Sequence, residues 1–369
     1  MRHRSHVALA TVVSVIALLV LAATPALAHS HGASYTRSAL VTIPGNALTS
    51  FDISWVDPSS QTYYLADRSN AGIDIIDART HTYVGRVTGF QGFHGSNDTA
   101  GPNGVVVVHP QHDLWAGDGD STVKVVDLTT NAIVATLSTG GSKRADEMAY
   151  DQKDDLLLVA NDAEDVPFVT FIDVRSRTVL NRISFPDATN GIEQSVWDPV
   201  THLFYLSLPQ LGSDPMHGGI AVIDPRTRSL VTIRSVSDCQ PAGLALGPDQ
   251  HLLLGCSGDA IAAGAHAQTQ IMDARSGAIV ATIMQVGGSD EVWYNPGDKR
   301  YYLAARSMTS NGLSSGTATP VLGVIDATSN TWITNVATGP QSHSVAANPI
   351  NNEVFVPLRG LGIGIYTHD

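Results

Sequence analysis

The sequence is short of basic residues and cysteine, and it lacks the motifs of the common catalytic sites. It has 21 Lys and Arg against 34 Asp and Glu, with no run of basic residues. An acidic chain does not suit nucleic acid or an anionic lipid surface as a partner, because both attract cations. GxGxxG, the P-loop, GxSxG, HExxH and the haem-attachment CxxCH are all absent. None of the corresponding sites is therefore predicted.

Long apolar runs are also absent after residue 28, so no later segment is predicted to cross a bilayer. The chain begins with basic MRHRSH and an apolar stretch from Val7 to about Ala23, followed by Ala26-Leu27-Ala28. This order is typical of a secretory signal peptide with a small-residue cleavage site. We expect residues 1–28 to be removed and residues 29–369 to form a secreted or periplasmic protein without membrane insertion.

What the sequence does contain is a unit of roughly 45 to 50 residues that recurs seven times. Each unit opens with a short apolar strand and a turn, as in FDISWVDP (51–58) and DEVWYNP (290–296). Three more short apolar runs follow, and the third usually ends in Asp with Thr or Ser close behind. Four strands per unit, repeated in a circle, predict an all-β, seven-bladed β-propeller of four-stranded blades.

The ends of the repeat predict how the ring closes. The seventh unit supplies only three strands, whereas SALVTIPG (38–45) precedes the first unit and matches the closing strand of the others. Pairing this N-terminal strand with the last blade would remove two exposed sheet edges. We therefore expect one propeller domain over residues 29–369, and a monomer.

The units resemble a known family in LLLVAND (156–162), which is followed by FIDVRSRTVLNRI (171–183). They are similar to the YVTN-type repeats of bacterial seven-bladed propellers, the YncE-like family. The resemblance covers nearly the whole mature chain and implies an extracytoplasmic propeller. It implies no particular reaction, since propellers include enzymes, binding modules and scaffolds.

The two cysteines, Cys239 and Cys256, flank the first hairpin of the fifth unit. In an exported protein such a pair predicts a structural disulfide, and similar spacings in exported YVTN-like proteins agree. A simple hairpin register would offset the two residues by a few positions. The segment before Pro241 must therefore fold back for the bond to form.

Propeller geometry predicts which residues share a site. Six positions before the turn of each repeat, the chain enters the mouth of the central funnel, on the face that carries the links between blades. The residues at this ring position are Asp52, Gly104, Asp146, Glu193, Ala242, Asp290 and His343. We predict ligand-binding roles for Asp52, Asn103, Asp146, Glu147, Gln194, Glu291, Arg68 and Arg306.

Four acids and a histidine at one structural position leave two interpretations open. Rim arginines could pair with the acids, because crowded like charges otherwise raise one another's pKa values and cost stability. Alternatively a divalent metal, calcium or a transition metal, could balance them. The predicted metal ligands are Glu193, Asp290, His343 and His94. After signal cleavage, His29-Ser30-His31 would form a separate candidate site for copper or nickel.

Two functions from different classes follow from these residues. The first is a non-catalytic binding propeller that uses its funnel face to bind a ligand or partner. The alternative is a metal-dependent hydrolase of a lactone or ester, in which the acidic ring holds the cation and His343 acts as base. That chemistry would be similar to the gluconolactonase-like propellers, which have six blades rather than seven. The sequence leaves open whether the protein is an enzyme.

Overall fold

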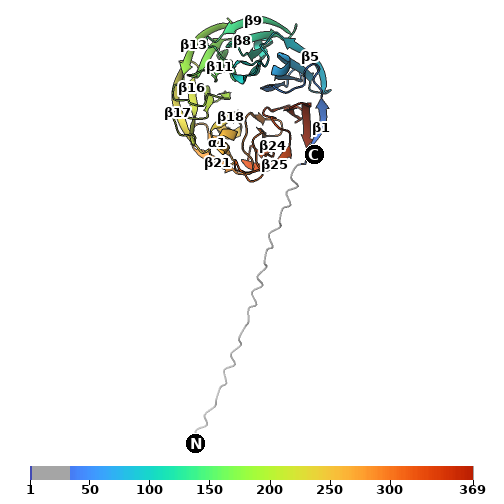
Figure 1. The fold of residues 1–369 in the computed structure, drawn as a ribbon. Helices are drawn as coiled ribbons and strands as arrows, with labels where there is room; N and C mark the ends of the chain where they lie inside the picture. The colour runs from blue at the N-terminus through green and yellow to red at the C-terminus, as the bar shows by residue number, and fades with distance from the viewer. Residues whose placement is uncertain (2–33, 369) are drawn as a thin grey trace. The chain divides into compact units, whose positions relative to one another are not determined.

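The fold is a ring of seven antiparallel sheets, seen along its axis in Figure 1. The computed structural model describes Met1 and residues 34–368. Each sheet has four strands, and the innermost strands of neighbouring sheets contact one another around the whole ring. The predicted all-β, seven-bladed propeller is confirmed.

The strands take equivalent places in every blade. The innermost strands are β2 (Ser54–Asp57), β6 (Val105–Val108), β10 (Met148–Asp151), β14 (Ser195–Asp198), β18 (Pro241–Leu246), β22 (Val292–Asn295) and β26 (Ala346–Ala347). The second strands are β3 (Thr62–Asp67), β7 (Asp113–Gly117), β11 (Leu156–Asn161), β15 (Leu203–Leu208), β19 (His251–Cys256), β23 (Arg300–Ala305) and β27 (Val354–Leu358). The third strands are β4 (Gly72–Asp77), β8 (Thr122–Asp127), β12 (Phe168–Asp173), β16 (His217–Asp224), β20 (Thr269–Asp273), β24 (Val321–Asp326) and β28 (Gly362–His368). The outermost strands are β5 (Thr82–Thr88), β9 (Ala132–Ser138), β13 (Thr178–Ser184), β17 (Ser229–Ser237), β21 (Ile279–Ile283), β25 (Thr331–Ala337) and β1 (Tyr35–Val41).

Burial follows the position of a strand in its blade. The second strand β11 reads LLLVAN and is buried at every residue, because neighbouring blades cover both of its faces. The outermost strands β9 and β13 alternate between exposed and half-buried residues. Only short helices interrupt the described strands: α1 (Gly258–Ala262) and the 3₁₀ turns η1 (Arg68–Asn70), η2 (Asn97–Thr99), η3 (His109–Gln111) and η4 (Pro248–Gln250).

The repeated Asp at the end of the third strand fixes the turn that follows. The carboxylate of Asp77 accepts hydrogen bonds from the backbone N–H groups of Arg79 and Thr80, at 2.9 and 3.0 Å. Asp127 and Asp326 bind the equivalent backbone groups of their own turns. These are the hydrogen bonds by which Asp stabilises a tight turn, so the repeated Asp has a structural role in these blades.

The ring closes through its N-terminal strand. β1 pairs antiparallel with β28, from Tyr35 opposite His368 to Val41 opposite Ile363. Val41 is 4 % exposed and lies in one core cluster with Ile363. The closing strand thus completes the last blade as predicted, although it begins and ends earlier in the chain than the 38–45 segment.

The predicted disulfide between Cys239 and Cys256 is present, and both residues are buried. The register of β18 and β19 shifts between Pro241 and Leu244, which places Pro241 opposite Cys256. Asp238 and Gln240 have φ values of 57° and 43°. The chain before Pro241 therefore folds back through left-handed residues, as the pairing required.

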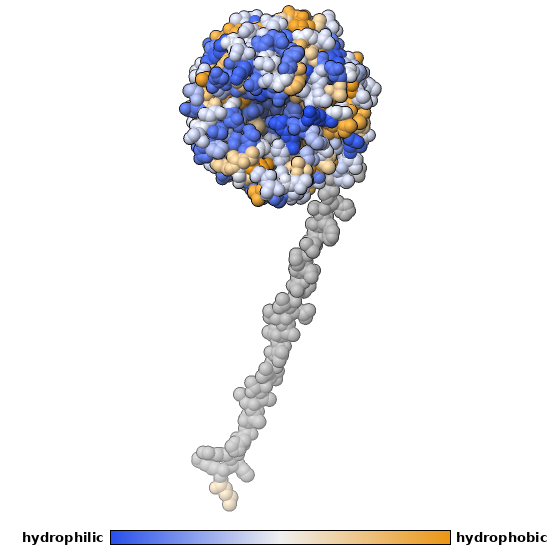
Figure 2. All heavy atoms as spheres, viewed as in Figure 1, coloured by the Kyte–Doolittle hydropathy of each residue, from blue (hydrophilic) through white to orange (hydrophobic). Residues whose placement is uncertain are grey.

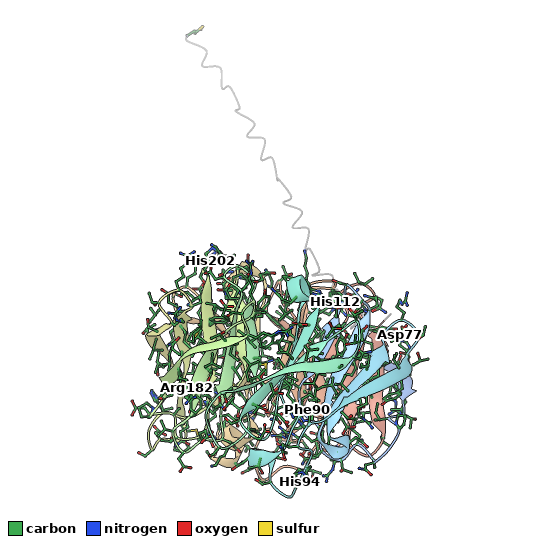
Figure 3. The ribbon with its side chains drawn as sticks, turned by 90° about the horizontal axis from the view of Figure 1, so that it is seen from above. Asp77, Phe90, His94, His112, Arg182 and His202 are labelled. Carbon is green, nitrogen blue, oxygen red and sulfur yellow. A yellow bond between two sulfur atoms is a disulfide. The ribbon has the colours of Figure 1, made fainter. Side chains whose placement is uncertain are left out.

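The two faces of the ring carry different loops. Figure 3 shows His94, from the link between the first two blades, at one end of the molecule, and His112 and His202 at the other. His112 and His202 belong to turns between first and second strands, so these turns lie on the face opposite the link that carries His94. Among the described residues, no helix has both the length and the apolar character that a membrane crossing needs. Apart from Met1, the predicted signal peptide and residues 29–31 lie outside the described part of the chain.

Candidate functional site

The ring position opens into a polar cavity of about 420 Å³. Five of the seven ring residues line it: Asp52, Asp146, Glu193, Asp290 and His343. The face shown in Figure 2 has hydrophilic side chains gathered around its centre. We call this cavity the funnel. Glu147 and Glu291, which directly follow Asp146 and Asp290 in the chain, lie at the inner end of the funnel.

The same backbone contact positions these acids in each blade. The N–H of Asp52 donates to Ala66 O at 2.8 Å, and the N–H of Asp146 donates to Ala160 O at 2.8 Å. Glu193 and Asp290 make the equivalent bonds to the ends of their own second strands. Each acid therefore stands just before its innermost strand and is already hydrogen-bonded to the second strand of the same blade. The four side chains occupy equivalent places and point toward one axis.

The two ring residues that do not line the funnel are small. Gly104 packs so closely on the next blade that a Cβ there would lie 2.1 Å from the carbonyl oxygen of Asp146. Ala242 is buried, 5 % exposed. These positions contribute to packing between blades and leave the funnel to the acids.

Arginines neutralise three of the four ring acids. Arg68 forms an ion pair with Asp52, and the side chains are 4 % and 11 % exposed. Arg144 Nε lies 2.8 Å from Asp146 Oδ2, and Arg306 lies 2.8 Å from Asp290 Oδ2. Burial alone would raise the pKa of Asp52, but Arg68 and His343 outweigh it and hold that pKa below its usual value. The predicted pairing of acids with rim arginines is present.

Arg144 contacts two carboxylates. Its Nε also lies 2.9 Å from Asp162 Oδ1, so one guanidinium serves two carboxylates. Burial would lower the pKa of Arg144, but the two aspartates raise it above the usual value. Asp162 was not among the predicted site residues. Its position in the repeat could have identified it, because Asp162 stands two residues after Ala160, just as Arg68 stands two residues after Ala66.

His343 lies against the funnel wall. Its Nε2 is 3.1 Å from Phe51 O and 3.5 Å from Asp52 Oδ1, and its Nδ1 is 2.9 Å from Gln341 O. The ring stacks on Phe51 with centroids 4.7 Å apart. Both ring nitrogens thus face backbone carbonyls, an arrangement that suits a donor of hydrogen bonds more than a metal ligand or a base.

Three glutamates complete the funnel without an ion pair. Glu147 and Glu291 are 4 % and 6 % exposed, and their carboxyl groups share a hydrogen bond. Burial and the Glu291 carboxyl raise the pKa of Glu147 well above its usual value. Burial and Asp290 do the same for Glu193, which is half-buried. Six carboxyl groups and four arginines line the funnel.

Two predicted ligand-binding residues take part in packing around the site. Asn103 Oδ1 accepts from Arg68 Nε at 2.9 Å, while its Nδ2 donates to Ala145 O at 2.9 Å. Gln194 Oε1 accepts from the N–H of Leu244 at 2.6 Å. Neither side chain lines the funnel. Asn103 orients Arg68, and Gln194 ties its inner strand to the next.

The predicted metal ligands are not gathered at one point. His94 does not line the funnel, and its Nε2 contacts Gln91 O, whereas Phe93 and Asn97 of the same link do line it. Asp290 is paired with Arg306. Within residues 34–368, no three His, Cys, Asp or Glu side chains are arranged to hold a metal ion. A metal at Glu193, Asp290, His343 and His94 stays a prediction.

Comparison with known proteins supports the fold alone. No family model matches the chain, and no curated protein matches it. A chain in the solved structure of hydrazine synthase from Kuenenia stuttgartiensis is similar, with a TM-score of 0.68 and 14 % identity over 88 % of this chain and 96 % of that one. A chain in a crystal structure of the mitotic checkpoint complex has a TM-score of 0.68 and 13 % identity over 97 % of this chain and 99 % of that one. Propellers commonly bind proteins or ligands, but identities this low carry no activity from one to another.

Proposed function

We propose that this chain is a non-catalytic binding propeller whose funnel takes a positively charged group of a ligand. The observation that carries the proposal is a carboxyl group left without a partner, whose ionised form a bound cation would stabilise. Asp52, Asp146 and Asp290 each have an arginine, whereas Glu193 lines the funnel with no ion pair or side-chain hydrogen bond among the described residues. A protonated amine would supply the missing charge and donors to Glu193.

The size of the funnel suits one basic group. A volume of about 420 Å³ lies at the small end of the range for ligand pockets. A free alkylamine and a lysine side chain present the same ammonium group and are two sources of one chemistry. The arginines of the rim would repel a second cation and confine binding to the centre.

Calorimetric titration tests the proposal with three ligands. These are propylamine, an end-capped Gly-Gly-Lys-Gly-Gly peptide, and the same peptide with Glu in place of Lys. We expect the lysine peptide or propylamine to bind and the glutamate peptide not to bind. Glu193→Gln should weaken binding about ten-fold, because a hydrogen bond to a charged group is worth roughly 1.5–3 kcal/mol.

A charge-matched control separates the site from the general acidity of the chain. Asp249 is exposed in a first-to-second-strand turn with φ 58°, a conformation that Asn also adopts. Asp249→Asn removes one negative charge and should leave binding unchanged. Equal binding of the lysine and glutamate peptides, or equal effects of the two variants, would contradict the proposal.

The metal-dependent lactonase or esterase is the second proposal, and the pairing of Asp290 with Arg306 makes it the weaker one. Elemental analysis of natively purified protein distinguishes the two. A stoichiometric calcium or transition-metal ion that disappears in Glu193→Gln would favour the hydrolase over the amine-binding propeller. We also propose, from the repeat sequence and the predicted leader, that the protein is an exported, monomeric YncE-like propeller.

A further inference from the structure

A second, larger cavity of about 680 Å³ lies along the axis beyond the funnel. Its walls are the innermost strands, and most of the residues that line it are apolar or aromatic. His109, Pro110 and Pro199 also line it. These residues belong to turns at the face that Figure 3 marks with His112 and His202, opposite His94. We call this cavity the channel, and its entrance lies on the face opposite the funnel.

Three indole rings give the channel an aromatic wall. Trp55, Trp197 and Trp293 are half-buried and line the channel from three different blades. Trp55 and Trp293 meet edge to face, with ring centroids 5.2 Å apart. The rings also pack against core residues of neighbouring blades. They therefore serve the fold and at the same time present aromatic surface to whatever occupies the channel.

The inner end of the channel is polar and lacks a cation. Glu147 and Glu291 line both cavities, so they stand at the boundary between channel and funnel. Both are more than nine-tenths buried, and neither has an ion pair among the described residues. Ser195, 5 % exposed, also lines the channel, and its Oγ has no hydrogen-bond partner. Buried polar groups in proteins are normally satisfied, so the unpartnered Ser195 hydroxyl marks a polar deficit beside the paired carboxyl groups of Glu147 and Glu291.

We propose that the channel binds a small apolar molecule with one protonated amine, entering from the face opposite the funnel. The ammonium group donates to Glu147 and Glu291 at the inner end, where its positive charge favours ionisation of this carboxyl pair. The apolar body lies among Trp55, Trp197 and Trp293, whose ring faces attract both apolar surface and positive charge. The site shares Glu147 and Glu291 with the funnel but differs from it in specificity, which depends on the apolar body.

Intrinsic fluorescence tests the proposal, because three of the five tryptophans line the channel. The ligands are 4-phenylbutylamine, 4-phenylbutanol and 4-phenylbutanoate, which share one body and differ in charge. We expect a saturable change in emission with the amine, binding of the alcohol weaker by about ten-fold or more, and none of the acid. Equal affinity of amine and alcohol, or no binding of the amine, would overturn the proposal.

Variants assign the signal to the channel. Trp197→Phe should weaken binding of the amine several-fold and leave propylamine binding in the funnel unaltered. Glu147→Gln/Glu291→Gln should bring the amine and the alcohol to the same affinity. Trp332→Phe is the matched control, because Trp332 is 39 % exposed on the outermost strand β25. This variant should bind the amine as the native chain does. A Trp197→Phe chain that binds 4-phenylbutylamine with native affinity would place the amine elsewhere and reject the channel.

Discussion

Arg144→Met should lower the free energy of unfolding by about 3–5 kcal/mol, the usual cost of removing one partner from a buried ion pair. Methionine has a similar length and flexibility, so the change removes charge with little loss of volume. It leaves Asp146 and Asp162, 4 % and 7 % exposed, without their shared guanidinium. Urea denaturation at pH 7, followed by far-UV circular dichroism, measures the loss as a shift in midpoint at constant slope.

An exposed arginine in an ion pair provides the control. Arg175 lies 2.6 Å from Asp155 Oδ2, but its side chain is 75 % exposed. Arg175→Met should therefore cost less than about 1 kcal/mol, as is usual for surface ion pairs. Removing the two unpaired carboxylates as well, with Asp146→Asn/Asp162→Asn in the Arg144→Met background, should recover part of the loss. Similar losses for the two arginines would show that burial of Arg144 carries no special weight.

The blades and their closure could be predicted because they repeat. A four-strand pattern seen seven times averages out local ambiguity, and the missing strand of the last unit identifies β1 as its partner. The disulfide was predicted from two cysteines in a chain expected to be exported. The backbone conformation around the disulfide was not predictable in detail. The register shift between Pro241 and Leu244 depends on left-handed residues that the repeat pattern does not identify.

The acids of the funnel could be predicted by counting, but their partners could not. Asp52 and Asp290 follow from the repeat, and so do Arg68 and Arg306 at equivalent places after the second strand. Arg144 breaks the pattern, because it comes from a link between blades and reaches Asp162 as well as Asp146. Links vary in length from blade to blade, so a repeat gives no position for their side chains. For the same reason Phe93 and Asn97 were missed in the link where His94 was favoured.

Glu147→Gln/Glu291→Gln should have the opposite effect to Arg144→Met and raise the free energy of unfolding at pH 8 by about 2 kcal/mol. Burial raises the pKa of both carboxyl groups well above their usual values, so the native chain binds more protons here than the unfolded chain. Such a group stabilises the fold fully below its unfolded pKa of about 4.3, and that stability is lost as pH rises through the native pKa. The gain of the variant should therefore be small near pH 4.5 and grow with pH.

Glu164→Gln is the matched control, because the environment of Glu164 lowers its pKa whereas that of Glu147 and Glu291 raises theirs. Its carboxylate accepts hydrogen bonds from the backbone N–H groups of Ser142 and Lys143, at 2.5 and 2.6 Å. Slight burial raises the pKa of Glu164, but these bonds outweigh it and the net shift is downward. Its stabilisation is present above the unfolded pKa and is lost as pH falls through the native pKa. Glu164→Gln should thus lower the free energy of unfolding at pH 8 and have little effect on it at acid pH. If urea midpoints from pH 4.5 to pH 8 show the same trend for both variants, the two buried glutamates are not held in their neutral form by the fold.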